Sequence, residues 1–493
     1  MTDNRPIKKP APGAQKPPPK SVHSGFNGVV YRQPDKIVDV STGRTMLIDA
    51  ILKGDGKRIE RLLASGANPG KTDKKGKSPL HFAACLGQLE TVRLLLQQGA
   101  QVNPRDKTLA TPLLEALDGP RPLEMLELLL QAGADANIAD KNNRVPLHTA
   151  AQKCGKEVIL RLARATENPG RPDKTGVTPL HEACRKNGLE AVQAMLSDRV
   201  SVFSATNEGD TALHFAALRE NGDIAQYLLT MEAAQLVNAV NLEGQTPLHL
   251  AVKRCKIDLA QQMLLVGADV NLADRRGMSP LHLAAGSGNE ALVLLLIRNG
   301  ADVSKESPVS VTTPLLQALG EDSSLSVMRI LLEHDADPNA SGRGDTSPLL
   351  MAIHLRNSTA VALLLQAGAD PDLVNKRGHT ALHSACAYGL ENEVKMLLAR
   401  KANPNIPNHL GRTPLHQLME AGPSNFSLTG ILLDAGADPL IKDKYGITAF
   451  DMAYDRGQNA ILDLFKNKLA EKGISYTPNA PKRPPASPPE WGH

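Results

Sequence analysis

Short runs of apolar residues alternate with polar turns along this chain, and the stretch 274–303 shows the pattern in full. Its segment Asp274–Gly277 is polar and predicts a tight turn in which Gly277 adopts a positive φ. Ser279 is suited to cap a helix through its hydroxyl, and Pro280 fits the first helical position, where no amide donor is needed. The stretch therefore begins with a turn that leads directly into a helix.

Two apolar stripes follow this turn at helical spacing. Small and apolar residues from Leu281 to Ala285 form the first, and the leucines from Leu292 to Leu296 form the second. Gly300 ends the second stripe, as glycine commonly does just beyond a helix. The predicted unit is a turn, a helix, a short loop, a second helix and a loop.

The string Thr-Pro-Leu-His, or a near copy, returns every 33 to 35 residues and marks the start of each unit. Its first residue gives thirteen anchors: Thr45, Ser78, Thr111, Val145, Thr178, Thr211, Thr246, Ser279, Thr313, Ser347, Thr380, Thr413 and Thr448. A fixed period of this length is typical of a solenoid, in which each unit buries its apolar face against its neighbours. We therefore predict one quasi-linear domain rather than several globular ones.

The unit resembles the ankyrin repeat. The resemblance rests on Thr-Pro-Leu-His at 178–181, 246–249 and 413–416, and on the Gly-Ala-Asp strings that begin at positions 133, 267, 300, 368 and 436. It implies an all-α solenoid of stacked antiparallel helix pairs with projecting hairpin loops. It also implies that protein partners bind across the hairpin tips and the concave groove formed by the inner helices.

The expected domain organisation has four parts. Residues 1–22 form a Pro-rich, basic tail, 23–44 an ordered lead-in, 45–473 an array of about 13 repeats, and 474–493 a Pro-rich tail. Both tails are expected to be disordered, because such compositions bury too little apolar surface to offset the entropy of ordering. The string Pro478–Arg483 fits a Pro-x-x-Pro-x-Arg ligand for an SH3-type domain.

Composition and charge narrow the class of protein without naming a partner. The net charge is +4, of which 1–22 carry +4 and 474–493 carry +1, so the array itself is nearly neutral. The five cysteines are an odd number, and Cys85, Cys184 and Cys386 fall at small core positions, which favours reduced thiols. No signal peptide or membrane span is visible, so we expect an intracellular, cytoplasmic protein that does not enter a membrane.

Eight histidines occupy the fourth position of the repeated string: His81, His148, His181, His214, His249, His282, His383 and His416. A catalytic or metal site would need these side chains to converge, whereas a stack spaces them one per unit. We predict instead that each imidazole bridges backbone groups of neighbouring loops. The sequence thus predicts no catalytic residue, metal or cofactor, and no enzyme.

Basic residues recur just after the paired small residues of the first helix in four consecutive units. They are Lys153, Arg185, Lys186, Arg219, Lys253 and Arg254, and the next hairpin adds Arg275 and Arg276. In the ankyrin family these helix positions face the concave groove, so one interpretation is a surface for an acidic or phosphorylated partner. The other is that these are solvated helix ends, where the macrodipole favours cations. Aromatic residues do not interleave with the cations, which argues against nucleic acid.

The function that follows is that of a non-enzymatic scaffold or adaptor for protein–protein interaction. Two alternatives share the same fold. One is a microbial effector that acts on host proteins, and the other is a regulatory subunit of an enzyme or channel.

Overall fold

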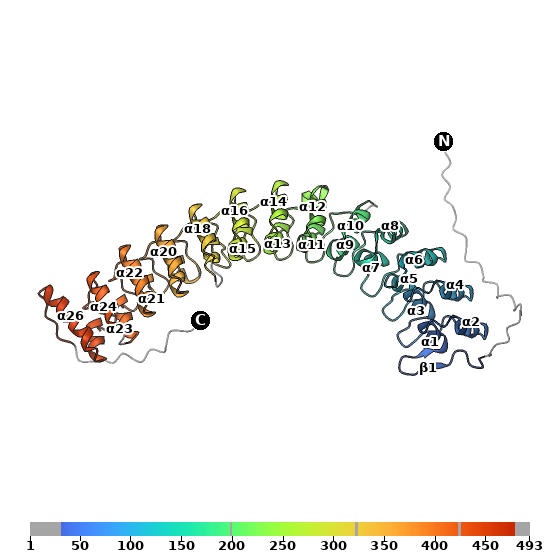
Figure 1. Ribbon diagram of the computed structural model, residues 1–493, viewed down its shortest axis with the longest axis horizontal. Coiled ribbons are helices and arrows are strands. Elements are labelled where there is room, and N and C mark those ends of the chain that lie inside the picture. Colours follow the sequence, from blue (N-terminus) through green and yellow to red (C-terminus); the bar gives the residue numbers. More distant parts are fainter. Residues whose placement is uncertain (1–30, 198–199, 321–323, 423–424, 479–493) are drawn as a thin grey trace. The chain divides into compact units, whose positions relative to one another are not determined.

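The computed structural model describes residues 31–197, 200–320, 324–422 and 425–478 (Figure 1). The predicted basic tail, the start of the lead-in and the C-terminal residues from 479 onward lie outside the described residues, and with them most of the SH3-type string. The chain forms two compact units, Met1–Lys141 and Asn142–His493.

The first unit opens with a small antiparallel hairpin and continues as helix pairs. Its elements are β1 (Ile37–Asp39), β2 (Arg44–Thr45), α1 (Met46–Leu52), α2 (Gly56–Ala64), α3 (Pro79–Cys85), α4 (Leu89–Gln97), α5 (Pro112–Ala116) and α6 (Pro122–Gln131). The hairpin belongs to the described part of the expected lead-in. Asp35 beside it accepts a hydrogen bond from the Asn68 amide at 2.9 Å, which ties the lead-in to the first repeat.

The second unit is a succession of helix pairs with two short 3₁₀ segments. Its elements are α7 (Pro146–Lys153), α8 (Lys156–Ala165), α9 (Pro179–Lys186), α10 (Leu189–Leu196), α11 (Ala212–Leu218), α12 (Asp223–Leu229), η1 (Glu232–Leu236), α13 (Pro247–Lys253), α14 (Ile257–Leu265), α15 (Pro280–Gly286), α16 (Glu290–Arg298), α17 (Pro314–Ala318), α18 (Leu325–Glu333), η2 (Arg343–Asp345), α19 (Pro348–His354), α20 (Ser358–Gln366), α21 (Ala381–Ala387), α22 (Glu391–Ala399), α23 (Pro414–Glu420), α24 (Phe426–Asp434), α25 (Ala449–Asp455) and α26 (Asn459–Glu471).

In the repeat anchored at Thr178, the first helix α9 packs on the second helix of its own repeat, α10, and on the first helices of the adjacent repeats, α7 and α11. The paired small residues allow this close approach, and Ala183 and Cys184 of α9 are fully buried. Cys386 is buried in the same way in α21, while Cys85 in α3 is only half-buried. All five cysteines are free thiols. The all-α solenoid predicted from the period is confirmed.

Successive hairpins are joined by backbone hydrogen bonds, as the repeat anchored at Thr178 shows. The Lys174 amide donates to the Asn142 carbonyl of the preceding hairpin at 3.0 Å. Gly176 has φ +81°, and a Cβ there would lie 2.5 Å from the Asn207 backbone nitrogen of the next hairpin. Glycine is therefore required both by the turn and by the neighbouring repeat.

The repeated histidines link each repeat to the next through their two ring nitrogens. In His181, Nδ1 accepts a hydrogen bond from the Thr178 amide at 3.1 Å, so Nε2 carries the proton and donates to the Ser204 carbonyl at 3.0 Å. The Nε2 groups of the other seven donate in the same way to the carbonyls of Ala110, Val177, Gln245, Met278, Thr312, Arg412 and Ile447. The predicted bridging role is confirmed.

The last repeat replaces this link with a different one. Asp451 stands where the histidine is expected and accepts from the Thr448 amide at 3.0 Å and from the Thr448 hydroxyl at 2.8 Å. The hydroxyl of Tyr476 donates to the same carboxylate at 3.1 Å, and its ring packs against Phe450 with centroids 5.2 Å apart. Within residues 474–478 of the expected C-terminal tail, Tyr476 therefore contacts the first helix of the last repeat.

The histidine links predict a specific loss of stability in mild acid. Burial lowers the pKa of His181 and His383 to about 4, whereas an unfolded histidine titrates near 6.5. Between these values the unfolded chain binds protons that the folded chain does not, so stability is full above pH 6.5 and falls as the pH drops toward 4. For each of the two histidines, proton binding by the unfolded chain should lower the unfolding free energy by about 2 kcal/mol between pH 7 and pH 5.

Denaturant unfolding followed by circular dichroism at pH 7 and pH 5 measures this loss. His181→Leu is the matched variant, because Leu316 and Leu350 already occupy the same position in two other repeats. The variant should be less stable at pH 7, since the Ser204 carbonyl loses its donor, but its loss on acidification should be smaller. If both proteins lost the same unfolding free energy between pH 7 and pH 5, the acid sensitivity could not be assigned to His181.

The loop between the two helices of a repeat carries a residue in the left-handed region, and this residue is glycine in several repeats. Gly288 and Gly389 have φ of +69° and +68°, whereas Cys255 takes the same position with φ +55° and Arg356 with φ +54°. A side chain in this conformation costs about 1 kcal/mol or more. The loop at Cys255 is therefore strained.

Replacing Cys255 by glycine should remove that strain. We expect Cys255→Gly to raise the unfolding free energy by about 0.5–1 kcal/mol, because the relief exceeds the extra backbone entropy of glycine. Gly389→Ala is the reverse control: its Cβ would meet nothing within 4 Å, so only the backbone strain is added and stability should fall. Thermal denaturation of both variants measures the effect, and a lower midpoint for Cys255→Gly would refute it.

Candidate functional site

Six of the eight candidate cations lie at the C-terminal ends of consecutive first helices in the second unit. Lys153 ends α7, Arg185 and Lys186 end α9, Arg219 follows α11, and Lys253 and Arg254 end and follow α13. Arg219 is half-buried and the other five are exposed. We call these six residues the helix-end row.

Contacts between neighbouring helix ends connect α7 with α9 and α9 with α11. Asn187, the residue after α9, donates through Nδ2 to the carbonyls of Ala151 and Cys154 at the end of α7, at 3.0 and 2.9 Å. Burial raises the pKa of the Cys184 thiol in α9 to about 12, and the positive charge of Arg219 opposes part of that rise. Arg219 therefore lies beside α9 as well as at the end of its own helix.

Arg275 and Arg276 do not join the row. They lie in the hairpin before α15, at the N-terminal end of a first helix, whereas the row lies at the C-terminal ends. A helix of 7 residues separates the two positions by roughly 10 Å along its axis. The Arg276 Nε also lies 3.6 Å from the Asp274 carboxylate of its own turn. The structure thus divides the eight candidates into two groups at opposite ends of the first helices.

Arg185 is engaged by a buried carboxylate. The side chain of Glu182 in α9 is 1% exposed, and its Oε2 accepts from Arg185 Nη2 at 2.6 Å. Its Oε1 lies 3.1 Å from Arg144 Nη1, and Gln152 Nε2 donates to Oε2 at 3.4 Å. Within the row, Arg185 is therefore partly neutralised by its own helix, which sequence spacing alone did not indicate.

Glu182 also lines a groove of about 770 Å³ between the hairpin tips and the first helices α9 and α11. Its walls carry charges of both signs, including Arg144, Lys174 and Asp210, and the half-exposed ring of Phe215. Mixed charges and a buried ion pair make this groove a part of the fold's own polar network rather than a basic surface.

Replacing Glu182 by glutamine should therefore affect stability. The change leaves two guanidinium groups close together without their shared carboxylate, and we expect a loss of about 1–2 kcal/mol, since both arginines are partly exposed. Glu208→Gln on an exposed hairpin tip is the matched control and should change little. Equal melting temperatures of the two variants would show that the Glu182 contacts do not stabilise the repeat.

Lys256 is a basic residue that sequence reasoning missed. It lies in the loop after α13 and is the N-cap residue of α14. Burial lowers the pKa of its ammonium group, and the neighbouring charges of Arg254 and Arg219 lower it further. The available signal was the run Lys253–Lys256, in which a cysteine stands at the left-handed loop position and a lysine follows it.

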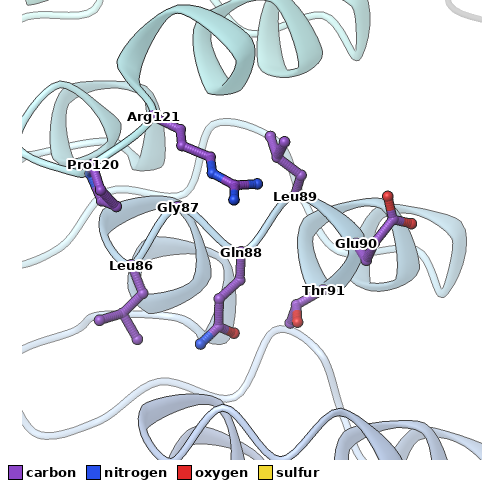
Figure 2. Close-up of a pocket in the computed structure, with 8 residues that line it drawn as sticks. All are labelled: Leu86, Gly87, Gln88, Leu89, Glu90, Thr91, Pro120 and Arg121. Atoms are coloured by element: carbon purple, nitrogen blue, oxygen red, sulfur yellow. The ribbon is translucent and has the colours of Figure 1, made fainter.

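The first unit has a smaller hollow, of about 460 Å³, between the inter-helix loops of two repeats. Figure 2 shows the Arg121 side chain extending over this space, which is lined by Gly87, Leu89 and Pro120 among others. Gln88 in the same lining is tied to the first repeat, because its Nε2 donates to the Ile51 carbonyl at 2.7 Å. Arg121 is the one cation in this lining, so the hollow has no counterpart to the row.

The described part of the chain contains no cluster of three or more His, Cys, Asp or Glu side chains arranged to hold a metal ion. Over the same residues, no helix has the length and hydropathy that crossing a membrane requires.

A family model described as ankyrin repeats matches the chain in overlapping stretches that together run without a break from residue 47 to residue 443. The chain belongs to the ankyrin-repeat family. The matched stretches are 47–140, 116–205, 147–240, 198–274, 231–307, 255–342, 315–408 and 349–443. Ankyrin repeats are protein–protein interaction modules, so the general role of this chain is that of an interaction scaffold.

Curated relatives share single stretches of the ankyrin array. The chain is 39% identical to the potassium channel GORK of Arabidopsis thaliana over 70 residues, which are 14% of this chain and 8% of the channel. It is 33% identical to serine/threonine-protein kinase 12 of the same plant over 103 residues, 21% of each chain. It is 42% identical to the 2-5A-dependent ribonuclease of Mus musculus over 71 residues, 14% of this chain and 10% of the ribonuclease. The chain thus spans less than a quarter of each of these relatives.

Among solved structures, the ankyrin repeat domain of Bcl-3, titled a unique member of the IkappaB protein family, is 30% identical. The match covers 42% of this chain and 93% of that domain, with a TM-score of 0.39.

Proposed function

We propose that this ankyrin-repeat scaffold binds an acidic or phosphorylated segment of a protein partner along the helix-end row. The observation that carries the proposal is the position of the cations. They stand at the same end of the first helix in four consecutive repeats, and Lys186, Lys253 and Arg254 are exposed there. An acidic chain that crosses these helices meets a cation at each step.

The helix macrodipole alone does not account for the row. It acts on every first helix, yet α3, α15 and α21 end without a basic residue, at Cys85, Gly286 and Ala387. Isolated cations also follow other first helices, such as Lys53 after α1 and Arg456 after α25, whereas the repeats of α7, α9, α11 and α13 carry them in succession. A local function explains this unbroken run better than a general property of helix ends.

The repeat geometry also indicates the spacing of the ligand. Packed helices lie about 8–10 Å apart, and an extended chain advances about 3.3 Å per residue. An extended segment with an acidic residue at about every third position therefore matches one charge to each repeat. Such a ligand also favours a protein partner, because its backbone can hydrogen-bond along the loops while its side chains meet the row.

The alternatives of a microbial effector and a regulatory subunit would use the same binding surface. The relatives named as a channel, a kinase and a ribonuclease share only short stretches of the repeat array with this chain. No observation on the described residues favours either alternative, and the scaffold stands as the proposed function.

Charge reversal tests the proposal directly. The probe is a fluorescein-labelled peptide with glutamate at every third position, and its binding is followed by fluorescence polarisation in low salt. Lys186→Glu with Arg254→Glu should weaken binding by about tenfold or more, because two attractive contacts become repulsive. The affinity of the unmodified protein should fall as salt is added.

Arg298→Glu with Arg400→Glu is the matched control. Both residues are exposed and stand at the C-terminal ends of second helices, so this variant makes the same change of net charge away from the row. Equal losses of affinity in the two double variants would show that binding depends on the net charge of the protein and not on the row. Unchanged binding in Lys186→Glu with Arg254→Glu would end the proposal.

A further inference from the structure

Two cations of the helix-end row, Arg219 and Arg254, act electrostatically on Lys256, and two of these three side chains hold buried donors that the protein itself does not use. In the described part of the chain, Arg219 Nε and Lys256 Nζ are buried and have no hydrogen-bond partner. Buried donors in folded proteins are nearly always paired, and an unpaired one is destabilising. Two such donors close together therefore mark a position that an acceptor completes.

The charges around these donors do not balance. The Lys256 ammonium experiences the positive charges of Arg254 and Arg219 and the negative charge of Glu220. Glu220 itself is exposed, so solvent screens much of its effect. Three cations against one carboxylate leave an excess of positive charge that attracts an anion with more than one negative charge.

The loop that carries two of these cations combines two features that cost stability. Four described second helices begin with a side chain that accepts from a backbone amide, as Asn289 does for α16 at 3.0 Å, and the others, such as α4, α10 and α22, lack such a cap. At α14 the same position is Lys256, which cannot accept a hydrogen bond and adds positive charge where the macrodipole is already positive. The preceding Cys255 is held in the left-handed region.

Local departures that destabilise a fold without an evident structural gain are characteristic of functional positions. Here the cation at a helix start, the strained loop residue and the two unpaired donors all occur at one place in the array. The gain that would offset them is a bound anion, which would accept from the donors and neutralise the cations.

We propose that Arg219, Arg254 and Lys256 form a binding site for a phosphate monoester on a phosphorylated serine or threonine of the partner segment. The site rests on the proposed function, since it lies within the row that receives that segment. A phosphate monoester carries about −1.5 to −2 charges at pH 7 and three acceptor oxygens, whereas a carboxylate carries about −1. The phosphate therefore matches both the charge excess and the presence of donors on separate side chains.

The experiment compares one labelled peptide in three forms, with phosphoserine, glutamate or serine at its centre and glutamate at every third flanking position. Binding is measured by fluorescence polarisation to the full chain. The phosphoserine form should bind about tenfold or more tighter than the glutamate form. Lys256→Gln should abolish this preference and leave binding of the glutamate form nearly unchanged.

Arg298→Gln, at the end of α16, is the matched control and should retain the preference. Folding is not at risk in Lys256→Gln, because the change removes a buried charge without a hydrogen-bond partner, and its melting temperature should stay equal or rise. Cys255 gives an independent readout, since it is the exposed thiol next to the site. The phosphoserine peptide should slow alkylation of Cys255 by iodoacetamide more than the glutamate peptide does.

The outcomes separate this site from the wider proposal. Suppose that the glutamate form binds, that its affinity depends on Lys186, and that phosphoserine does not raise the affinity. The proposal for the row is then supported and the phosphate site is refuted. A preference that survives Lys256→Gln refutes the site as well. If none of the three forms binds, both proposals fail. A single-stranded RNA that binds as tightly as the phosphopeptide, and loses its binding in Lys256→Gln, would assign the site to nucleic acid and overturn the proposal.

Discussion

Every other feature of this molecule depends on the link that the repeated histidine makes between neighbouring repeats. One ring nitrogen accepts from the backbone where the first helix begins, and the other donates to a carbonyl of the next repeat, as His249 does to Met278 at 3.1 Å. The imidazole therefore fixes the start of one helix and its distance from the next repeat at once. Since a single repeat cannot bury its apolar face alone, this link sets the geometry in which stacking becomes possible.

The link also explains why a row of surface charges can exist. Repeats held at a constant distance place equivalent positions in line, so a lysine or arginine at the same position of consecutive repeats produces a continuous surface. Where leucine replaces the histidine, the helix is capped by the hydroxyl alone, as Thr313 does for α17 by accepting from the Leu316 amide at 3.3 Å. The row lies among repeats that keep the histidine, from His148 to His249, so its spacing is fixed by the histidine links of these four repeats.

The periodicity of the sequence predicted the features that recur from repeat to repeat. It did not indicate the contacts between particular side chains of different repeats. The helix starts, the buried small residues and the histidine links follow from residue types at fixed spacing, and the structure confirms them. The pairing of Glu182 with Arg144 joins residues of different repeats, and no residue type in either repeat indicates it. The burial of the Lys256 ammonium is likewise produced by its neighbours, because lysine in a loop is ordinarily exposed.

The division between the helix-end row and the hairpin pair Arg275 and Arg276 has the same physical origin. Periodicity shows which residues are equivalent in successive repeats, but two positions within one repeat are separated by the length of a helix. A ligand that follows the row thus runs across the repeats and need not reach the hairpin tips. Binding along the row would engage several repeats together, and because the stability of such an array is a sum of repeat and interface terms, it would stabilise those interfaces against local unfolding. The unpaired donors beside the row then belong to the unbound state, and their cost is what a bound anion would relieve.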